Sequence, residues 1–175
     1  RRDSAPRGAG RKEPRAKAAR GLHMLKELAK FFATFFYLGY FPMASGTFAS
    51  AFAVGICYVL KDQPAVYALA FIFITVIGFI TSDIVEKVVG KKDPSCVVID
   101  EVSGMMIALF MLPWTPAVVV TTFFLFRAFD MFKIYPMNKL EALGGGKGIM
   151  LDDIFAGIYA NLMMQIALYL STQIS

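Results

Sequence analysis

Five apolar segments separated by short polar turns dominate the chain, and they constrain its fold more than any other feature. They are residues 47–60, 65–89, 97–112, 117–132 and 148–170. Hydrophobic residues make up 57% of the sequence and charged residues only 18%, against about 25% charged in a typical soluble domain. We therefore predict an all-α fold: an integral membrane bundle of about four to five apolar helices, preceded by an N-terminal amphipathic helix.

The lengths of these segments leave the number of membrane crossings open. The segment 65–89 is the clearest candidate to span a bilayer. The segments near 47–60 and 98–112 are short, because about fifteen helical residues extend only ~22 Å while the hydrocarbon core is ~30 Å thick. Such segments lean on neighbouring helices, extend with flanking residues, or do not cross.

Positive charge is concentrated in the first 30 residues. They carry ten of the 18 Lys and Arg and three acids, whereas residues 31–175 have a net charge of −2. Residues 1–21 are rich in Ala, Gly and Pro, so we predict a basic, disordered tail in front of a domain that covers residues 22–175. Attraction to anionic lipid head groups explains this tail better than nucleic-acid binding, which we do not expect. A transit peptide would have a similar composition, so whether residues 1–20 belong to the mature protein stays open.

The segment from Leu22 to Tyr40 mixes Lys and Glu with Leu and Phe at first and then becomes apolar. This pattern predicts an amphipathic helix that lies at the membrane surface and runs toward the bilayer.

Five carboxylates stand at the edges of the apolar segments, in three places of the sequence: Asp100 and Glu101, Asp130, and Asp152 and Asp153. A carboxylate near lipid costs about 2.5–3.5 kcal/mol, so it normally lines a water-filled site or binds a partner. The helix dipole would explain one acid at the start of a helix, but not a pair at each of two helix starts. Carboxylate clusters suit Mg²⁺, which prefers hard oxygen ligands together with substrate phosphates.

Basic residues accompany these acids. Arg127, Asp130 and Lys133 recur at i, i+3 and i+6, close to one face of a helix, where an ion pair with a snorkelling Lys is the alternative to a functional role. Lys147 lies in the glycine-rich stretch 144–148, which is either a flexible loop or a backbone cradle for a phosphate; the stretch lacks the spacing of a Walker loop. Acids for a metal beside cations for a phosphate indicate phosphate chemistry.

Several phosphatase mechanisms are excluded by what the sequence lacks. The one histidine, His23, lies in the basic N-terminal region, which argues against phosphohistidine and Ser/His schemes. Neither Cys57 nor Cys96 has an arginine six residues later, and no Asp-x-Asp-x-Thr/Val stretch is present for an aspartyl-phosphate route. Metal-assisted attack by water remains.

The distribution of lysines predicts the orientation. If the N-terminal tail is cytoplasmic and each of the five segments crosses the membrane, most of the remaining lysines fall on the inner side. They are Lys87, Lys91, Lys92, Lys133, Lys139 and Lys147, whereas the outer loops keep only Lys61. Such a bias is usual for cytoplasmic loops. The same path places Gly46, Thr47, Asp93 and all five carboxylates at the inner face, so we predict a multi-pass protein whose acidic site faces the cytoplasm.

Four ordered motifs give the chain a specific resemblance. They are Ser45-Gly46-Thr47-Phe48-Ala49-Ser50; Asp93 followed by Val98-Ile99-Asp100-Glu101-Val102-Ser103-Gly104-Met105; Phe126-Arg127-Ala128-Phe129-Asp130-Met131-Phe132-Lys133 with Pro136; and Gly146-Lys147-Gly148-Ile149-Met150-Leu151-Asp152-Asp153-Ile154-Phe155-Ala156-Gly157. With these motifs the chain resembles the phosphatidylglycerophosphatase A family from about Phe41 to Gln165. One departure is Ser45, where the family usually has Pro before Gly-Thr.

The resemblance implies Mg²⁺-dependent hydrolysis of phosphatidylglycerophosphate to phosphatidylglycerol and inorganic phosphate, a step of phospholipid biosynthesis at the cytoplasmic face of the bacterial inner membrane. Residues 22–175 would then form a membrane-embedded lipid phosphatase domain. Our hypothesis for the metal ligands is Asp100, Glu101, Asp152 and Asp153. Asp130 is a further ligand or a general base, so that the catalytic carboxylates are Asp100, Glu101, Asp130 and Asp153. The substrate-binding residues would be Thr47, Arg127, Lys133 and Lys147.

Two other classes of protein use acids in membranes. Phosphatidyl-transferring enzymes of the CDP-alcohol class have a conserved Asp pattern that this sequence lacks. An ion-coupled carrier would place its acids near the bilayer midplane rather than at one face. Release of phosphate from a lipid phosphomonoester would separate these classes. The sequence leaves open whether the chain forms homo-oligomers.

Overall fold

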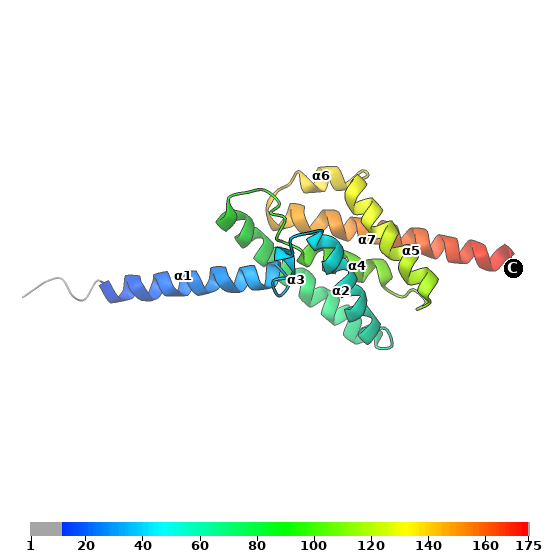
Figure 1. Cartoon of the computed structure of the whole chain (residues 1–175), viewed down its shortest axis with the longest axis horizontal. Helices are drawn as coiled ribbons and strands as arrows, with labels where there is room; N and C mark the ends of the chain where they lie inside the picture. The colour runs from blue at the N-terminus through cyan, green and yellow to red at the C-terminus, as the bar shows by residue number, and fades with distance from the viewer. Residues whose placement is uncertain (1–11, 175) are drawn as a thin grey trace, which may run out of the picture.

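The computed structural model describes residues 12–174, and over that range the chain is entirely helical, without a strand. Its elements are α1 (Lys12–Ala33), the 3₁₀-helix η1 (Leu38–Tyr40), α2 (Ser45–Leu60), α3 (Pro64–Val89), α4 (Ile99–Leu109), α5 (Pro116–Phe132), α6 (Met137–Glu141) and α7 (Gly145–Ile174). The predicted all-α class is confirmed. Helix α1 and the C-terminal part of α7 project from opposite ends of the helical body (Figure 1).

Local sequence signals mark several of these helix ends. Pro64 and Pro116 occupy the first turns of α3 and α5, where a missing N–H costs nothing. The hydroxyl of Thr115 accepts a hydrogen bond from Val118 N at 3.3 Å and so caps α5. Gly90 ends α3 in the left-handed conformation, which suits glycine. These signals explain why the predicted bounds of the two helices agree with the structure.

Helix α1 differs from the predicted helix 22–40 at both ends. It begins at Lys12, so residues 12–21 of the predicted tail are helical, whereas residues 1–11 lie outside the described part of the chain. It ends at Ala33, because Phe35, Phe36 and Tyr37 all have positive φ angles and turn the chain. At the end of α1, before this turn, the carbonyl of Ala33 accepts a hydrogen bond from Val98 N at 2.9 Å. The turn therefore connects the end of α1 to the start of α4.

Two helices within the described residues are long and apolar enough to cross a membrane: α3, and α7 between Gly145 and Gln173. Helix α2 is apolar but has 16 residues, and α4 has only 11, so a bundle of four to five crossing helices is not confirmed. Large apolar side chains on α3, such as Leu69 and Phe73, are exposed on the protein. Contiguous exposed apolar surface indicates contact with lipid or a partner, so the structure is compatible with a membrane protein.

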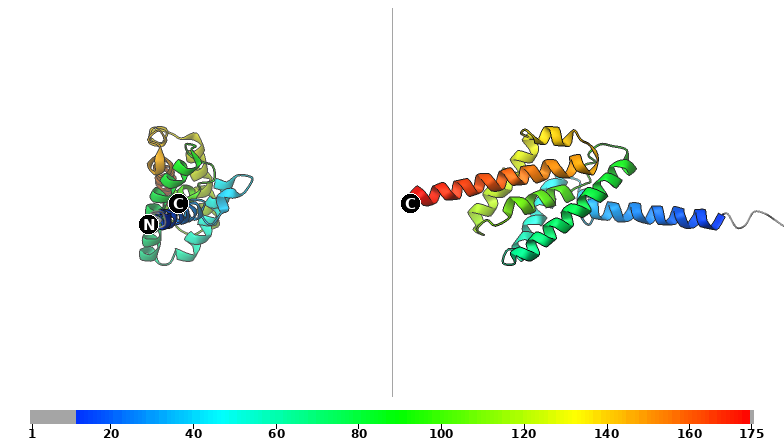
Figure 2. Two further views of the ribbon diagram at one scale, coloured as in Figure 1. Left: turned by 90° about the vertical axis from the view of Figure 1, so that its left-hand side faces the viewer. Right: turned by 180° about the vertical axis from the view of Figure 1, so that it is seen from behind.

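Helix α4 lies at the centre of the body and packs against α7, α2, α3 and α5. Glycines let α4 and α7 approach closely: a Cβ atom on Gly157 would overlap the carbonyl of Gly104, and one on Gly104 would lie 2.6 Å from the carbonyl of Asp153. Figure 2 shows α7 crossing the body from one end to the other. This close crossing sets the N-terminal turn of α4 beside the acidic part of α7.

Polar side chains from neighbouring helices hold the short α4 in place. Asn161 of α7 donates to the carbonyls of Ala108 (3.0 Å) and Phe110 (2.9 Å). The hydroxyl of Tyr67 donates to the carbonyl of Met106. The last carbonyls of a helix have no partner within the helix itself, so these bonds satisfy groups that would otherwise be buried unpaired. The C-terminal end of α4 is thereby fixed to both α3 and α7.

Candidate active site

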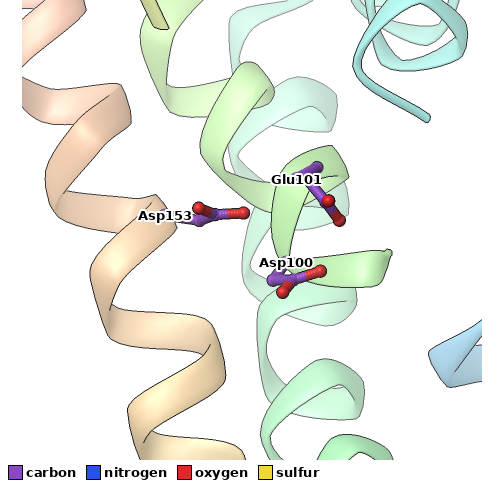
Figure 3. Close-up of side chains that lie close together, drawn as sticks. All are labelled: Asp100, Glu101 and Asp153. Atoms are coloured by element: carbon purple, nitrogen blue, oxygen red, sulfur yellow. The ribbon is translucent and has the colours of Figure 1, made fainter. Parts of the chain in front are cut away.

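Three carboxylates from two helices converge at the N-terminal end of α4. Asp100 and Glu101 lie in the first turn of α4 and Asp153 lies on α7, and one oxygen of each lies within 4.8 Å of the others. Figure 3 shows the side chain of Asp153 directed from α7 toward the two acids of α4. We call these residues the carboxylate trio. The sequence predicted that acids from distant segments lie close together, and the structure confirms this for Asp100, Glu101 and Asp153.

Asp100 and Asp153 of the trio are buried and Glu101 is half-buried. Asp100 is 7% exposed and Asp153 is 3% exposed. Asp100 Oδ1 and Glu101 Oε2 are buried without a hydrogen-bond partner among the described residues. Two charges 4.8 Å apart repel by about 3.5 kcal/mol at an effective dielectric constant of 20. A fully ionised trio therefore needs a cation nearby.

Burial is the main cause of altered acidity at the start of α4, which lies outside the two candidate spanning helices. It raises the pKa of Asp100 well above its usual range, and the neighbouring Glu101 and Asp153 carboxylates raise it further. Burial also raises the pKa of Glu101, where the effect of Asp130 adds and that of Arg127 opposes. Both shifts express the same fact: the site disfavours uncompensated negative charge.

The remaining two predicted acids have cationic partners. Asp130 Oδ2 forms an ion pair with Arg127 Nη1, three residues earlier on α5, at 2.7 Å. Asp152 Oδ2 lies 2.9 Å from Lys133 Nζ, which also lies 3.2 Å from Glu141 Oε1. We call Asp130 and Asp152 the paired carboxylates.

The paired carboxylates remain next to the trio. The backbone N–H of Asp153 donates to Asp152 Oδ1 at 3.1 Å, and the carboxylate of Asp130 neighbours both Glu101 and Asp153. Asp152 was predicted as a metal ligand, but the structure does not bring it into the group of three. Its oxygens are engaged by Lys133 and by the backbone.

Lys133 ends α5 in the left-handed conformation, with φ 44°. Burial alone would lower the pKa of Lys133, but its contacts with Asp152 and Glu141 outweigh burial and raise the pKa above its usual value. Asp93 lies nearby, also with a positive φ, and burial raises its pKa despite the opposing charge of Lys133. Lys133 is therefore a permanent cation inside an acidic neighbourhood.

Two predicted substrate residues, Thr47 and Lys147, have different surroundings. Thr47 is partly buried in the first turn of α2, beside Gly46, and Gly46 contacts the trio through Glu101. Lys147 is exposed and lines a separate hollow with Phe79, Asp83 and Gly144, to which none of the trio contributes. Thr47 thus directly follows a residue that contacts the trio, whereas Lys147 lines a hollow to which the trio does not contribute.

The glycine-rich stretch 144–148 serves the packing of α7 against α3. A Cβ atom on Gly146 would overlap the carbonyl of Phe79, and the N–H of Gly145 donates to Glu86 Oε1 at 3.1 Å. A carboxylate therefore already occupies one of the backbone donors that a phosphate cradle would use. The sequence did not single out Glu86, because it lies in the amphipathic continuation of an apolar helix. In the structure its second carboxylate oxygen, Oε2, is buried without a hydrogen-bond partner among the described residues.

Comparisons with known proteins agree with this geometry. The family model described as Phosphatidylglycerophosphatase A matches residues 31–168. A relative from Escherichia coli named Phosphatidylglycerophosphatase A is 34% identical over 127 residues, which are 69% of this chain and 72% of the relative. A relative from Bacteroides thetaiotaomicron named Putative phosphatidylinositol-3-phosphatase is 32% identical over 146 residues, 77% of this chain and 89% of the relative. No solved structure matches.

The cluster of three carboxylates could hold a metal ion on a helical body that is compatible with a membrane, and the names of both relatives describe phosphatases of phospholipids. The chain belongs to the phosphatidylglycerophosphatase A family, because the family model covers most of its length. It is accordingly a hydrolase, a phosphatidylglycerophosphatase by family, and the resemblance found from its motifs is confirmed.

Proposed function

We propose that the protein hydrolyses phosphatidylglycerophosphate to phosphatidylglycerol and inorganic phosphate in a Mg²⁺-dependent reaction. The observation that supports this most directly is the carboxylate trio. One oxygen from each of its three carboxylates lies within 4.8 Å of the other two, and Asp100 Oδ1 and Glu101 Oε2 are buried without partners among the described residues. The family supplies the substrate class, and the trio supplies the reason to expect a divalent cation.

The trio fits Mg²⁺ by the chemistry of its donors. Mg²⁺ prefers hard oxygen ligands and usually shares its coordination between one or two carboxylates and substrate phosphates. Asp100, Glu101 and Asp153 would hold it, and its charge would compensate their mutual repulsion. When bound, the ion supplies a Lewis acid that polarises a phosphoryl oxygen and favours attack by water. Asp152 would orient Asp153 through the backbone bond described above rather than bind the ion itself.

The neighbouring residues would bind and orient the phosphate. Arg127 lies beside the trio, and its planar guanidinium can grip two phosphate oxygens at once. Asp130, paired with Arg127 and adjacent to Asp153, would be a further ligand or would accept a proton from attacking water. Thr47 would add a hydrogen bond from the first turn of α2. Lys133 would support the phosphate electrostatically while it holds Asp152, and Lys147 remains a predicted contact that this conformation does not support.

A membrane location follows from the substrate and from α3 and α7. Both helices are long enough to cross a bilayer, and a lipid phosphomonoester is presented at the membrane surface. We propose a multi-pass protein of the bacterial inner membrane with the site facing the cytoplasm. The bias of lysines toward the same face supports this orientation.

The Bacteroides relative makes a second substrate worth testing. Its name describes a phosphatidylinositol-3-phosphatase, and phosphatidylinositol 3-phosphate is also a lipid phosphomonoester. The trio and Arg127 would engage the phosphate of either lipid. Selection would then depend on the head group rather than on the reaction chemistry.

The experiment is phosphate release by the detergent-solubilised full chain from each lipid in turn. Activity should disappear with EDTA, return with Mg²⁺, and fall at least about 100-fold in Asp100→Asn. Asp62→Asn is the matched control, because Asp62 is an exposed acid in the turn between α2 and α3. Turnover in thoroughly chelated protein would overturn the metal proposal. Faster release from phosphatidylinositol 3-phosphate than from phosphatidylglycerophosphate would overturn the substrate assignment.

A further inference from the structure

Gly46 has no side chain, and the space that one would occupy is filled by two residues of the site. A Cβ atom built on Gly46 would overlap Glu101 Oε1, lie 3.0 Å from Glu101 Cδ and lie 3.3 Å from Arg127 Nη1. Gly46 is buried in the first turn of α2, and its φ is not in the left-handed region. The backbone conformation therefore does not require glycine at position 46. Glycine is required because Glu101 and Arg127 leave no room for a side chain.

The first turn of α2 cannot easily move away. The hydroxyl of Ser45 donates to the carbonyl of Ser95, in the loop before α4, at 3.1 Å. Within α2 itself, the hydroxyl of Ser50 donates to the carbonyl of Gly46 at 2.9 Å. Further along α2, Ala49 and Ala53 are fully buried, and α2 packs closely against α4. Fixed polar and apolar contacts thus hold the backbone of this turn against the start of α4.

Glu101 is the group that would yield to an added methyl. Its carboxylate is the far end of a flexible side chain, whereas the contacts of other tightly packed glycines include backbone atoms, such as the carbonyl of Phe79 at Gly146. A methyl at Gly46 is therefore compatible with folding but displaces a member of the trio. It also comes close to the guanidinium of Arg127.

We propose that Gly46 is a positioning residue of the phosphatase site. Because Gly46 has no side chain, the carboxylate of Glu101 lies against α2 and beside Arg127, so that a metal ligand and a phosphate-binding group are fixed relative to each other. The roles given to Glu101 and Arg127 rest on the proposed function. The seating of Glu101 by Gly46 rests on the contacts alone.

Gly55 provides a matched control on the same helix. A Cβ atom on Gly55 would meet nothing within 4 Å, and replacing glycine by alanine within a helix is favourable in itself. Gly46→Ala and Gly55→Ala are thus the same chemical change in α2, with and without a neighbour from the site.

The test is a double-mutant cycle in the detergent-solubilised full chain: Gly46→Ala, Glu101→Asp, the two combined, and Gly55→Ala. Two quantities are measured: phosphate release from phosphatidylglycerophosphate, and binding of Mn²⁺, as a spectroscopic substitute for Mg²⁺, in the absence of lipid. We expect Gly46→Ala to weaken Mn²⁺ binding and turnover about 10–100-fold each, as losses of supporting residues around metal sites do, while Gly55→Ala changes neither. Because aspartate is one methylene shorter, the combined variant should lose less than the product of the two single losses.

The outcomes separate this inference from the proposed function. If the parent releases no phosphate from the lipid, the proposed function fails, and Mn²⁺ binding by the two alanine variants still decides the role of Gly46. If Gly46→Ala binds Mn²⁺ and turns over lipid within about two-fold of Gly55→Ala, the inference is overturned while the function stands. A loss of helical circular dichroism in Gly46→Ala that Glu101→Asp does not restore would also overturn it, because the overlap would then lie with the backbone.

Discussion

The carboxylate trio and the paired carboxylates lie side by side but differ in how their charge is balanced. Asp130 and Asp152 have ion pairs with Arg127 and Lys133 at 2.7 and 2.9 Å. Within the described part of the chain, Asp100, Glu101 and Asp153 have no ion pair, and two of their oxygens are buried without partners. The protein thus neutralises one set of acids with its own side chains, whereas the other set has no ion pair among the described residues and could hold a metal ion.

This difference assigns different tasks to residues of the same type. Breaking a buried ion pair leaves an uncompensated charge and destabilises a protein, so the paired carboxylates contribute to the folded state itself. Mutual repulsion makes the trio unfavourable until a cation binds. The trio is therefore expected to sacrifice stability for function, whereas the paired carboxylates support both.

The largest expected effect is that of metal removal. EDTA should reduce phosphate release to background, and Mg²⁺ should restore it, because the trio alone lacks the positive charge that the reaction needs. The measurement is a titration of Mg²⁺ into chelated protein. A matched titration with Asp62→Asn should give the same midpoint as the parent, since this exposed acid lies outside the site. Activity that persists without free divalent cation would show that the trio works as an acid cluster by itself.

The next largest effect is expected for Arg127→Lys. If Arg127 clamps the phosphate, loss of its planar fork should lower turnover about 10²–10³-fold, by analogy with the loss of one oxyanion donor. Lysine keeps the charge and can still pair with Asp130, so the thermal stability should change little. Turnover and Tm are to be measured on the same preparation. Turnover within a few-fold of the parent would assign Arg127 to the support of Asp130 rather than to substrate binding.

Smaller effects are expected on thermal stability, and they should have opposite signs in the variants Asp100→Asn and Asp152→Asn. In EDTA, Asp100→Asn removes repulsion within the trio and should stabilise the protein by about 1–3 kcal/mol, or raise Tm by roughly 2–10 °C. Asp152→Asn removes a partner of Lys133 and should lower Tm. Thermal denaturation of the parent and both variants in one detergent measures this. Changes of the same sign in both variants would contradict the division into trio and paired carboxylates.

Much of this division could not be predicted from the sequence. The positions of the acids at segment edges, and the folding of the segments back and forth, were enough to predict that the five acids gather at one site. They were not enough to single out Asp100, Glu101 and Asp153 as the group of three. Which acid pairs with which base depends on details such as the left-handed end of α5 at Lys133. The role of Gly46 is visible only from the atoms that surround it.

The fold shows the same limit. Pro64 and Pro116 predict the starts of α3 and α5, and Gly90 predicts the end of α3, because these residues act locally. The end of α1 depends on three consecutive aromatic residues with positive φ, which local propensity disfavours and tertiary packing imposes. Hydropathy also could not distinguish α3, whose apolar surface is exposed, from α4, whose apolar surface is buried by its neighbours.

The smallest effect is expected from removing the basic segment 1–20. The described contacts of α1 with the body lie further along, where Ala29 and Ala33 are buried and the helix packs on α3. The trio and the paired carboxylates receive nothing from residues 19 and 20, the first whose side chains the structure describes. Turnover of the truncated protein in neutral detergent micelles should therefore stay within about two-fold of the parent. On vesicles rich in anionic lipid it should fall further, because each basic residue near such a surface contributes about 1 kcal/mol of attraction. If truncation lowers turnover equally in micelles and on vesicles, residues 1–20 support the active site itself. Their contribution would then not be limited to binding the membrane.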